Sequence, residues 1–180
     1  YKCYEAIVRK YGGTCISQEE YWNGKRRKEK RTVLLEKTGF QGTYKEYITL
    51  WKEWIERDEF LSHEVVRNDT VKGLEWMRGH SESLFLVTMR QDRRQLEKQL
   101  ERLKLMPYFD KIVKGMPGVQ RKCEVIDPVL GAESLVIGDT EDDQELARVI
   151  GAEFLAVTCG LRERDYLDGA DYYLNSFFEL

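Results

Sequence analysis

The stretch that most constrains the fold is residues 134–143, where an apolar run meets a dense acidic turn. Leu135, Val136 and Ile137 follow one another without a polar break, which is typical of a strand buried on both faces of a parallel sheet. Gly138 ends this run. Four carboxylates then fall within five positions, namely Asp139, Glu141, Asp142 and Asp143.

Such a cluster of carboxylates suggests a bound cation. Like charges at this spacing repel each other, and a cation with oxygen ligands would relieve the repulsion. Mg²⁺ commonly binds one or two carboxylates together with phosphate, and open α/β sheets place their ligands at the carboxyl ends of strands. We therefore predict a Mg²⁺ site here. The alternative is that Asp142 and Asp143 only favour the positive end of the following helix.

The rest of the chain after about residue 68 alternates between the two kinds of regular structure. Strands are predicted at 84–88, 112–113, 135–137, 154–158 and 172–174, and helices at 69–79, 92–104, 123–130 and after the acidic turn. Asp69 is positioned to cap the first of these helices. Strands and helices alternating at this spacing indicate right-handed βαβ units. The predicted fold class is α/β, with a Rossmann-like parallel sheet and helices on both faces.

The first third of the chain contains no convincing strand, and we place a small α-helical domain at 1–66 and the α/β core at 67–180. The aromatic residues of the helical domain, which recur at helical spacing, are expected to form the core of a small bundle. Residues 25–37 contain a basic run that would suit a polyanion, but Glu29 and Glu36 interrupt it. A solvated helix face is the favoured interpretation of this run.

Composition narrows the function classes. The net charge is −3 and 34% of the residues are charged, so neither a nucleic-acid partner nor a membrane partner is indicated. No apolar run approaches the ~20 residues of a membrane helix. The four cysteines are scattered without a Cys-x-x-Cys pair and are expected to be reduced thiols, which favours a cytoplasmic location. The oligomeric state is not readable from the sequence.

Three segments could act together on phosphate. Thr88 ends one strand, Lys122 follows a glycine-containing loop, and Asp139 and Asp143 lie in the acidic turn. A hydroxyl, an ammonium and a carboxylate pair at successive crossovers suit phosphoryl transfer, in which positioning and charge neutralisation dominate.

The order of these segments resembles that of three motifs in the haloacid dehalogenase (HAD) superfamily. The segment that ends at Thr88 is similar to the second motif, Lys122 to the third, and the segment from Gly138 to Asp143 to the fourth. The resemblance covers about residues 68–180, and the helical first third is similar to the mobile α-helical cap of the family. Lys114 is the alternative to Lys122 as the lysine of the third motif.

The resemblance implies a Mg²⁺-dependent phosphohydrolase that acts on a small-molecule phosphate ester through an aspartyl-phosphate. It implies that Thr88 and its neighbouring amides hold the phosphoryl oxygens, and that Lys122 stabilises the nucleophile and the developing charge. It further implies that Asp139 binds Mg²⁺ with help from Asp143. Arg90, just beyond Thr88, is a candidate substrate contact.

The chain departs from the family in one respect. The first motif of the family, an Asp-x-Asp loop after an apolar strand, supplies the nucleophile, and no such strand occurs in these residues. We expect this motif N-terminal to Tyr1 and expect the chain as given to be inactive alone.

The strand that carries the first motif lies in the family between the strands that end at Thr88 and Ile137. Loss of this strand would leave its two neighbouring strands separated by about twice the ~4.8 Å strand spacing. Unpaired buried backbone groups on both sides would each cost on the order of 1–3 kcal/mol. We therefore expect the slot to be filled, by residues before Tyr1, by a partner segment or by an extended piece of the chain itself.

Other functions remain open at this point. A non-catalytic HAD-like binding or interaction module is the main alternative, although such a module has no physical need to keep a repulsive acidic cluster. A receiver-like signalling domain is disfavoured, because Asp139 comes late in the chain and a helical unit precedes the sheet. Within the enzyme class, phosphomutase chemistry is also possible, whereas dehalogenation needs no metal and suits the acidic pair less well.

Overall fold

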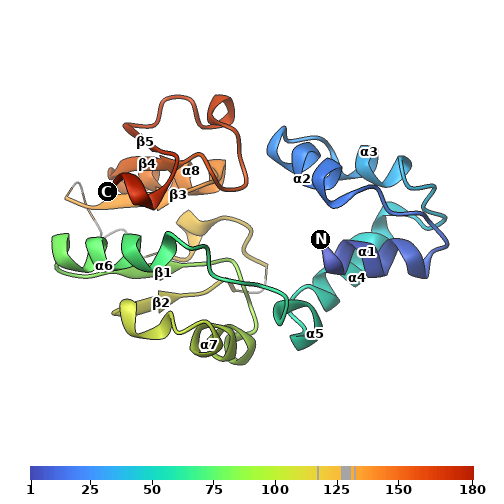
Figure 1. Cartoon of the computed structure of the whole chain (residues 1–180), viewed down its shortest axis with the longest axis horizontal. Helices are drawn as coiled ribbons and strands as arrows, with labels where there is room; N and C mark the ends of the chain where they lie inside the picture. The colour runs from blue at the N-terminus through green and yellow to red at the C-terminus, as the bar shows by residue number, and fades with distance from the viewer. Residues whose placement is uncertain (117, 127–130, 132) are drawn as a thin grey trace. The chain divides into compact units, whose positions relative to one another are not determined.

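The computed structural model describes residues 1–116, 118–126, 131 and 133–180 (Figure 1). The chain separates into two compact units, Tyr1–Glu64 and Val65–Leu180, here called the helical unit and the core unit. The division falls two residues before the boundary that the sequence suggests. None of the helices in the described ranges is both long enough and apolar enough to cross a membrane.

The regular structure of the helical unit, all of whose residues are described, is entirely helical. Ser17 accepts the N–H of Glu20 at 3.0 Å and so caps one helix, while Thr43 and Glu46 form a capping box on another. The helices are α1 (Lys2–Lys10), α2 (Gln18–Arg26), α3 (Arg31–Glu36), α4 (Tyr44–Trp54) and α5 (Asp58–Leu61).

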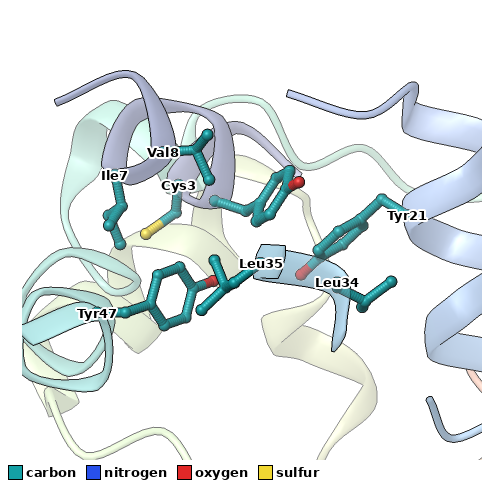
Figure 2. Packing of buried hydrophobic residues seen from close by; sticks show 8 residues of the cluster. Cys3, Ile7, Val8, Tyr21, Leu34, Leu35 and Tyr47 are labelled. Carbon is teal, nitrogen blue, oxygen red and sulfur yellow. The ribbon is translucent and has the colours of Figure 1, made fainter. Parts of the chain in front are cut away.

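Aromatic side chains form the centre of the helical unit (Figure 2). Tyr47, from α4, is fully buried, and burial raises the pKa of the neighbouring Tyr21 to about 12. The Arg31 guanidinium lies 4.8 Å from the ring centroid of Trp51, so this member of the basic run contributes to packing. The cluster of buried residues is Cys3, Tyr4, Ile7, Val8, Tyr21, Leu34, Leu35 and Tyr47.

The core unit alternates between helices and strands, and its strand pairs are all parallel, which confirms the α/β class. The α-helices are α6 (Thr70–His80), α7 (Arg93–Arg102) and α8 (Glu141–Ile150). The strands are β1 (Phe85–Val87), β2 (Lys111–Val113), β3 (Leu135–Gly138), β4 (Glu153–Val157) and β5 (Tyr172–Leu174). The described part of the unit also contains the 3₁₀ turns η1 (Met106–Tyr108), η2 (Lys122–Glu124), η3 (Arg164–Leu167) and η4 (Phe177–Glu179).

One predicted helix differs from the observed structure. The sequence predicts a helix over residues 123–130, but the described part of this segment holds only the short 3₁₀ turn η2. Residues 127–130 of the prediction lie outside the described residues.

The strands of the described residues form two separate sheets rather than one. One sheet has the order β1-β2 and the other the order β3-β4-β5 (Figure 1). Leu86 pairs with Ile112 in the first sheet, and Ile137 pairs with Leu155 in the second. No strand among the described residues pairs with the second edge of β1 or of β3. An extended piece of the described chain therefore does not fill the expected central position.

The direction of the backbone groups shows which atoms are left at these two edges. The N–H of Thr88 and the C=O of Leu84 form hydrogen bonds to the β2 segment. Because successive residues of a strand direct their backbone N–H and C=O groups to opposite edges, those of Phe85 and Val87 lie on the other edge of β1. Just before β3, the carbonyl of Ser134 accepts a hydrogen bond from the β4 segment. By the same alternation, the backbone groups of Leu135 and Ile137 point away from β4. Each sheet thus ends in a row of backbone donors and acceptors that have no strand partner in the described ranges.

Strand burial reflects this arrangement and corrects one expectation. The sequence predicts that residues 135–137 are buried on both faces, but Leu135 is 42% exposed and the other two residues are only partly buried. Among the described residues no strand lies on one edge of β3, so fewer side chains cover it. Partial exposure also lets water reach backbone groups whose burial without partners would be costly.

A buried carboxylate joins α6 to the end of the chain. Asp69 accepts hydrogen bonds from the Ser176 hydroxyl at 2.9 Å and the Phe177 amide at 3.0 Å, and forms an ion pair with Arg67 at 3.2 Å. Asp69 does precede α6 as predicted, but its side chain does not cap the helix. These long-range donors occupy the carboxylate instead. The Phe177 ring packs directly on the backbone of α6 at Gly73.

Candidate functional site

Asp139 follows β3 directly and lies beside the loop that follows β4. The Leu161 amide donates a hydrogen bond of 2.6 Å to Asp139 Oδ2. Asp139 Oδ1 accepts no hydrogen bond from the described residues. One oxygen of this carboxylate is therefore held by the protein, and the other is available to a ligand.

Asp143 lies in the first turn of α8 and is only 4% exposed. Its Oδ2 atom accepts hydrogen bonds from the Thr140 hydroxyl at 2.6 Å, the Thr140 amide at 3.1 Å and the Asp139 amide at 3.2 Å. These bonds satisfy backbone N–H groups that a helix N-terminus leaves without partners. The carboxylate thus fixes the turn that carries Asp139.

Lys122 joins this turn from a distant part of the sequence. Its ammonium forms an ion pair with Asp143 Oδ1, and its backbone N–H donates to Asp142 at 3.2 Å. Burial raises the pKa of the Asp142 carboxyl, although the Lys122 amide and ammonium act in the opposite direction. Lys114 makes no ion pair with this cluster in the described residues, which favours Lys122 over Lys114 as the lysine of the site.

Thr88 and Arg90 form a second tight turn, which follows β1. The Thr88 hydroxyl oxygen accepts the Arg90 amide at 3.3 Å, and the Thr88 amide bonds to the carbonyl of Val113 at 2.9 Å. The Arg90 carbonyl accepts the Gly115 amide at 3.0 Å. A Cβ atom at Gly115 would lie 2.5 Å from the Met89 carbonyl oxygen, so this position needs glycine for the close approach.

The structure brings together only part of the predicted set. Lys122, Asp139 and Asp143 form one connected cluster at the carboxyl end of β3, whereas Thr88 follows β1, a strand of the other sheet. No hydrogen bond between described residues joins Thr88 to that cluster. The two halves of the predicted phosphate site therefore lie on strands that do not pair with each other.

Sequence reasoning assigned no role in the site to the loop after β4, residues 159–162. Arg162 Nε lies 3.1 and 3.0 Å from the two carboxylate oxygens of Glu141, and a Cβ atom at Gly160 would lie 2.3 Å from Asp139 Oδ2. The sequence did hold a usable signal. Residues that follow parallel neighbouring strands meet at the same sheet edge, so residues 158–162 belong with residues 139–143.

The donor atoms present suit a hard cation. Oxygen ligands are those that Mg²⁺ prefers, and Asp139 offers an oxygen that makes no hydrogen bond to the described residues. Both oxygens of Asp143 already have partners. Within the described ranges, no group of three or more His, Cys, Asp or Glu side chains could hold a metal ion. A cation at Asp139 would therefore need further ligands from water, phosphate or another segment.

Comparisons with known proteins agree with the architecture. The family model for haloacid dehalogenase-like hydrolases matches residues 1–157. A haloacid dehalogenase-like family hydrolase from Streptococcus pneumoniae has a TM-score of 0.75 at 18% identity, over 99% of this chain and 86% of that one. A predicted phosphatase from Clostridium acetobutylicum has a TM-score of 0.74 at 19% identity, with the same coverage of both chains. The comparison with curated proteins gives no match.

Proposed function

The chain belongs to the haloacid dehalogenase-like hydrolase family, and we propose that this protein is a Mg²⁺-dependent phosphohydrolase of small phosphorylated metabolites. The observation that carries the proposal is the connected cluster of Lys122, Asp139 and Asp143 at the carboxyl end of a parallel strand. A cation site next to a partly buried ammonium is suited to binding and neutralising a phosphoryl group.

Each side chain of the cluster has a distinct proposed role. Asp139 would hold Mg²⁺ through Oδ1, and Mg²⁺ would supply positive charge for the phosphoryl oxygens. Asp143 would keep the Lys122 ammonium in place and fix the turn of Asp139, since both of its oxygens are already engaged. The ammonium of Lys122 would offset charge that develops on the phosphoryl group.

The second turn would hold the other side of the substrate. The hydroxyl of Thr88 is a hydrogen-bond donor once it is aimed at a phosphoryl oxygen, and the turn of residues 88–90 is fixed by Val113 and Gly115. Arg90 is proposed as a contact to the rest of the substrate. We also propose that the helical unit acts as the cap that selects the metabolite.

The nucleophile is proposed to be an aspartate on an additional strand between β1 and β3. Its carboxylate would attack phosphorus to give an aspartyl-phosphate while the P–O bond of the ester breaks and the alcohol leaves. Water would then hydrolyse the aspartyl-phosphate, which releases inorganic phosphate and restores the carboxylate. The edge of β1 at Phe85 and Val87 and the edge of β3 at Leu135 and Ile137 support this proposal, because both carry backbone groups that a parallel strand would satisfy. Such a strand would bring the turns of Thr88 and Asp139 into one site. Without it, residues 1–180 are proposed to be inactive.

Intact-mass analysis and N-terminal sequencing of the natural protein, followed by a phosphatase assay with p-nitrophenyl phosphate, test this function. We expect the natural protein to contain an apolar strand that ends in Asp-x-Asp and to hydrolyse the ester only with Mg²⁺. Residues 1–180 alone and the natural protein with Asp139→Asn should both lose turnover. A natural protein without such a strand and without turnover would exclude the proposal.

The separate sheets also favour a second candidate, a non-catalytic binding module. A parallel strand from a partner protein could fill the same position, since β-strand addition uses main-chain hydrogen bonds at free sheet edges. The two functions differ in one measurable property. A binding module would keep its partner affinity when Asp139 is replaced by Asn, and it would show no Mg²⁺-dependent turnover.

A further inference from the structure

We propose that the loop of residues 160–162 is the positioning element of the site, which holds the Asp139 carboxylate in one orientation and directs Oδ1 toward the cation. This inference rests on the proposed role of Asp139 in binding Mg²⁺. It assigns a positioning role to Gly160, Leu161 and Arg162, which lie outside the acidic turn and follow a different strand.

The first contact is the hydrogen bond from the Leu161 amide to Asp139 Oδ2, at 2.6 Å. Bonds from N–H groups to ionised carboxylates are among the stronger ones in proteins. This bond engages one oxygen and so restricts rotation about the bond that joins the carboxylate to Cβ. A ligand then meets Oδ1, the oxygen that the described residues leave without a hydrogen bond.

The second contact is the close approach of the loop backbone to the aspartate. A Cβ atom built on Gly160 would lie 2.3 Å from both Cβ and Oδ2 of Asp139, and 2.7 Å from Cγ. These separations are far below van der Waals contact, so any larger residue must displace either the loop or the aspartate. Glycine at this position allows the Leu161 amide to reach the carboxylate.

The third contact ties the far end of the loop to the acidic turn. Arg162 Nε lies 3.1 and 3.0 Å from the two oxygens of Glu141, and the Arg162 side chain is only 13% exposed. At the near end, the Arg67 guanidinium donates to the carbonyl of Cys159 at 3.2 Å. The loop is therefore anchored on both sides of the residue that holds Asp139.

These contacts give different roles to the four clustered carboxylates. Glu141 binds Arg162, Asp142 accepts the Lys122 amide, and Asp143 pairs with the Lys122 ammonium. Each of these three holds a neighbouring segment in place. Asp139 is the member whose orientation is set by another loop, as is usual for a metal ligand with an outer hydrogen-bond partner.

The test measures Mg²⁺ affinity by titration calorimetry in the full natural protein, without a substrate. Gly160→Ala should weaken binding about tenfold or more, the usual effect of disturbing an outer partner of a ligand. Gly79→Ala is the matched control, because a Cβ atom at Gly79 would meet nothing within 4 Å. Its affinity should equal that of the wild type. Amide hydrogen exchange at Leu161 should accelerate in Gly160→Ala alone.

Arg162→Ala provides a second variant in case Gly160→Ala does not fold. It should weaken Mg²⁺ binding several-fold, whereas Arg162→Lys, which keeps a cation next to Glu141, should retain most of the affinity. One outcome would overturn the positioning role and leave the proposed function intact. In it, Gly160→Ala and Arg162→Ala both bind Mg²⁺ with wild-type affinity, whereas Asp139→Asn loses binding. Unchanged binding in Asp139→Asn would instead overturn the metal assignment, and this inference with it.

Discussion

Lys122 and Asp143, which are 21 positions apart, form an ion pair between η2 and the first turn of α8. The same carboxylate accepts the amide and hydroxyl of Thr140, so one buried side chain connects a distant loop and a helix N-terminus. The pair therefore contributes to the fold as well as to the proposed site, and its removal should be measurable in stability before any activity is assayed.

Replacing Asp143 by Ala should lower the free energy of unfolding by about 3 kcal/mol, because the mutation leaves the poorly exposed Lys122 ammonium without its partner. Urea denaturation in Mg²⁺-free buffer measures this loss. Arg93→Ala is the control in the same unit. It breaks the exposed pair of Arg93 and Glu97, which should contribute no more than about 0.5 kcal/mol. A loss below about 1 kcal/mol for Asp143→Ala would contradict the buried-pair interpretation.

Two glycines of α6 should respond in opposite directions to the same substitution. In Gly73→Ala the new Cβ would lie 2.6 Å from the Phe177 ring, so overpacking should outweigh the gain in helix propensity and cost about 1 kcal/mol net. Gly79→Ala meets open space and should stabilise the protein by up to about 1 kcal/mol. Thermal unfolding of both variants checks the sign. Equal shifts would show that Phe177 does not pack on the helix.

The buried carboxylate of Asp69 should make stability depend on pH in the acidic range. The Arg67 guanidinium, together with Ser176 and Phe177, lowers the pKa of Asp69 to about 2, although burial opposes this shift. Because the folded pKa lies below the unfolded value of about 3.9, the contribution is fully present above pH 4 and is lost as the pH falls toward 2.

Asp69→Asn isolates this contribution. The difference in urea midpoint between wild type and Asp69→Asn should stay constant from pH 7 to pH 5 and should shrink below pH 4. Other titrating groups are common to both proteins and cancel in the comparison. A difference that stays unchanged down to pH 3 would show that the pKa of Asp69 is not lowered.

A lysine with left-handed backbone geometry ends α7 and offers a stabilising substitution. Lys104 has φ of +57°, and the next amide, that of Leu105, bonds back to the Leu100 carbonyl at 2.9 Å. Glycine is favoured at this position of a helix end, so Lys104→Gly should raise the free energy of unfolding by about 1 kcal/mol. Lys104→Ala keeps the Cβ atom and should give no such gain. Denaturant midpoints of the two variants settle the comparison.

Much of the core unit could be predicted from local patterns. The residues from Leu135 to Gly138 do form a strand, Asp139 follows it directly, and α8 begins at Glu141. The apolar run, the glycine and the acidic helix start are read within ten residues of one another, so no distant contact is needed to predict them. The parallel pairing of strands likewise followed from their alternation with helices.

The depth of burial was less predictable. An apolar run indicates that a strand can be buried, but coverage depends on the neighbours that the rest of the chain supplies. Leu135 is 42% exposed, and the described part of the chain gives β3 a strand partner on one edge only. Asp69 precedes α6 as its sequence position suggests, yet its side chain bonds to Ser176, more than a hundred positions away.

The sequence by itself determined the α/β class, the order of the strands along the chain and the position of Asp139 at a strand end, because these follow from local periodicity and capping. Only the tertiary structure decided the partner of each carboxylate and the close contact of Gly160 with Asp139. It also decided that β1 and β3 belong to separate sheets. Such contacts depend on how distant segments meet at the edge of a sheet, and local patterns in the sequence do not specify that geometry.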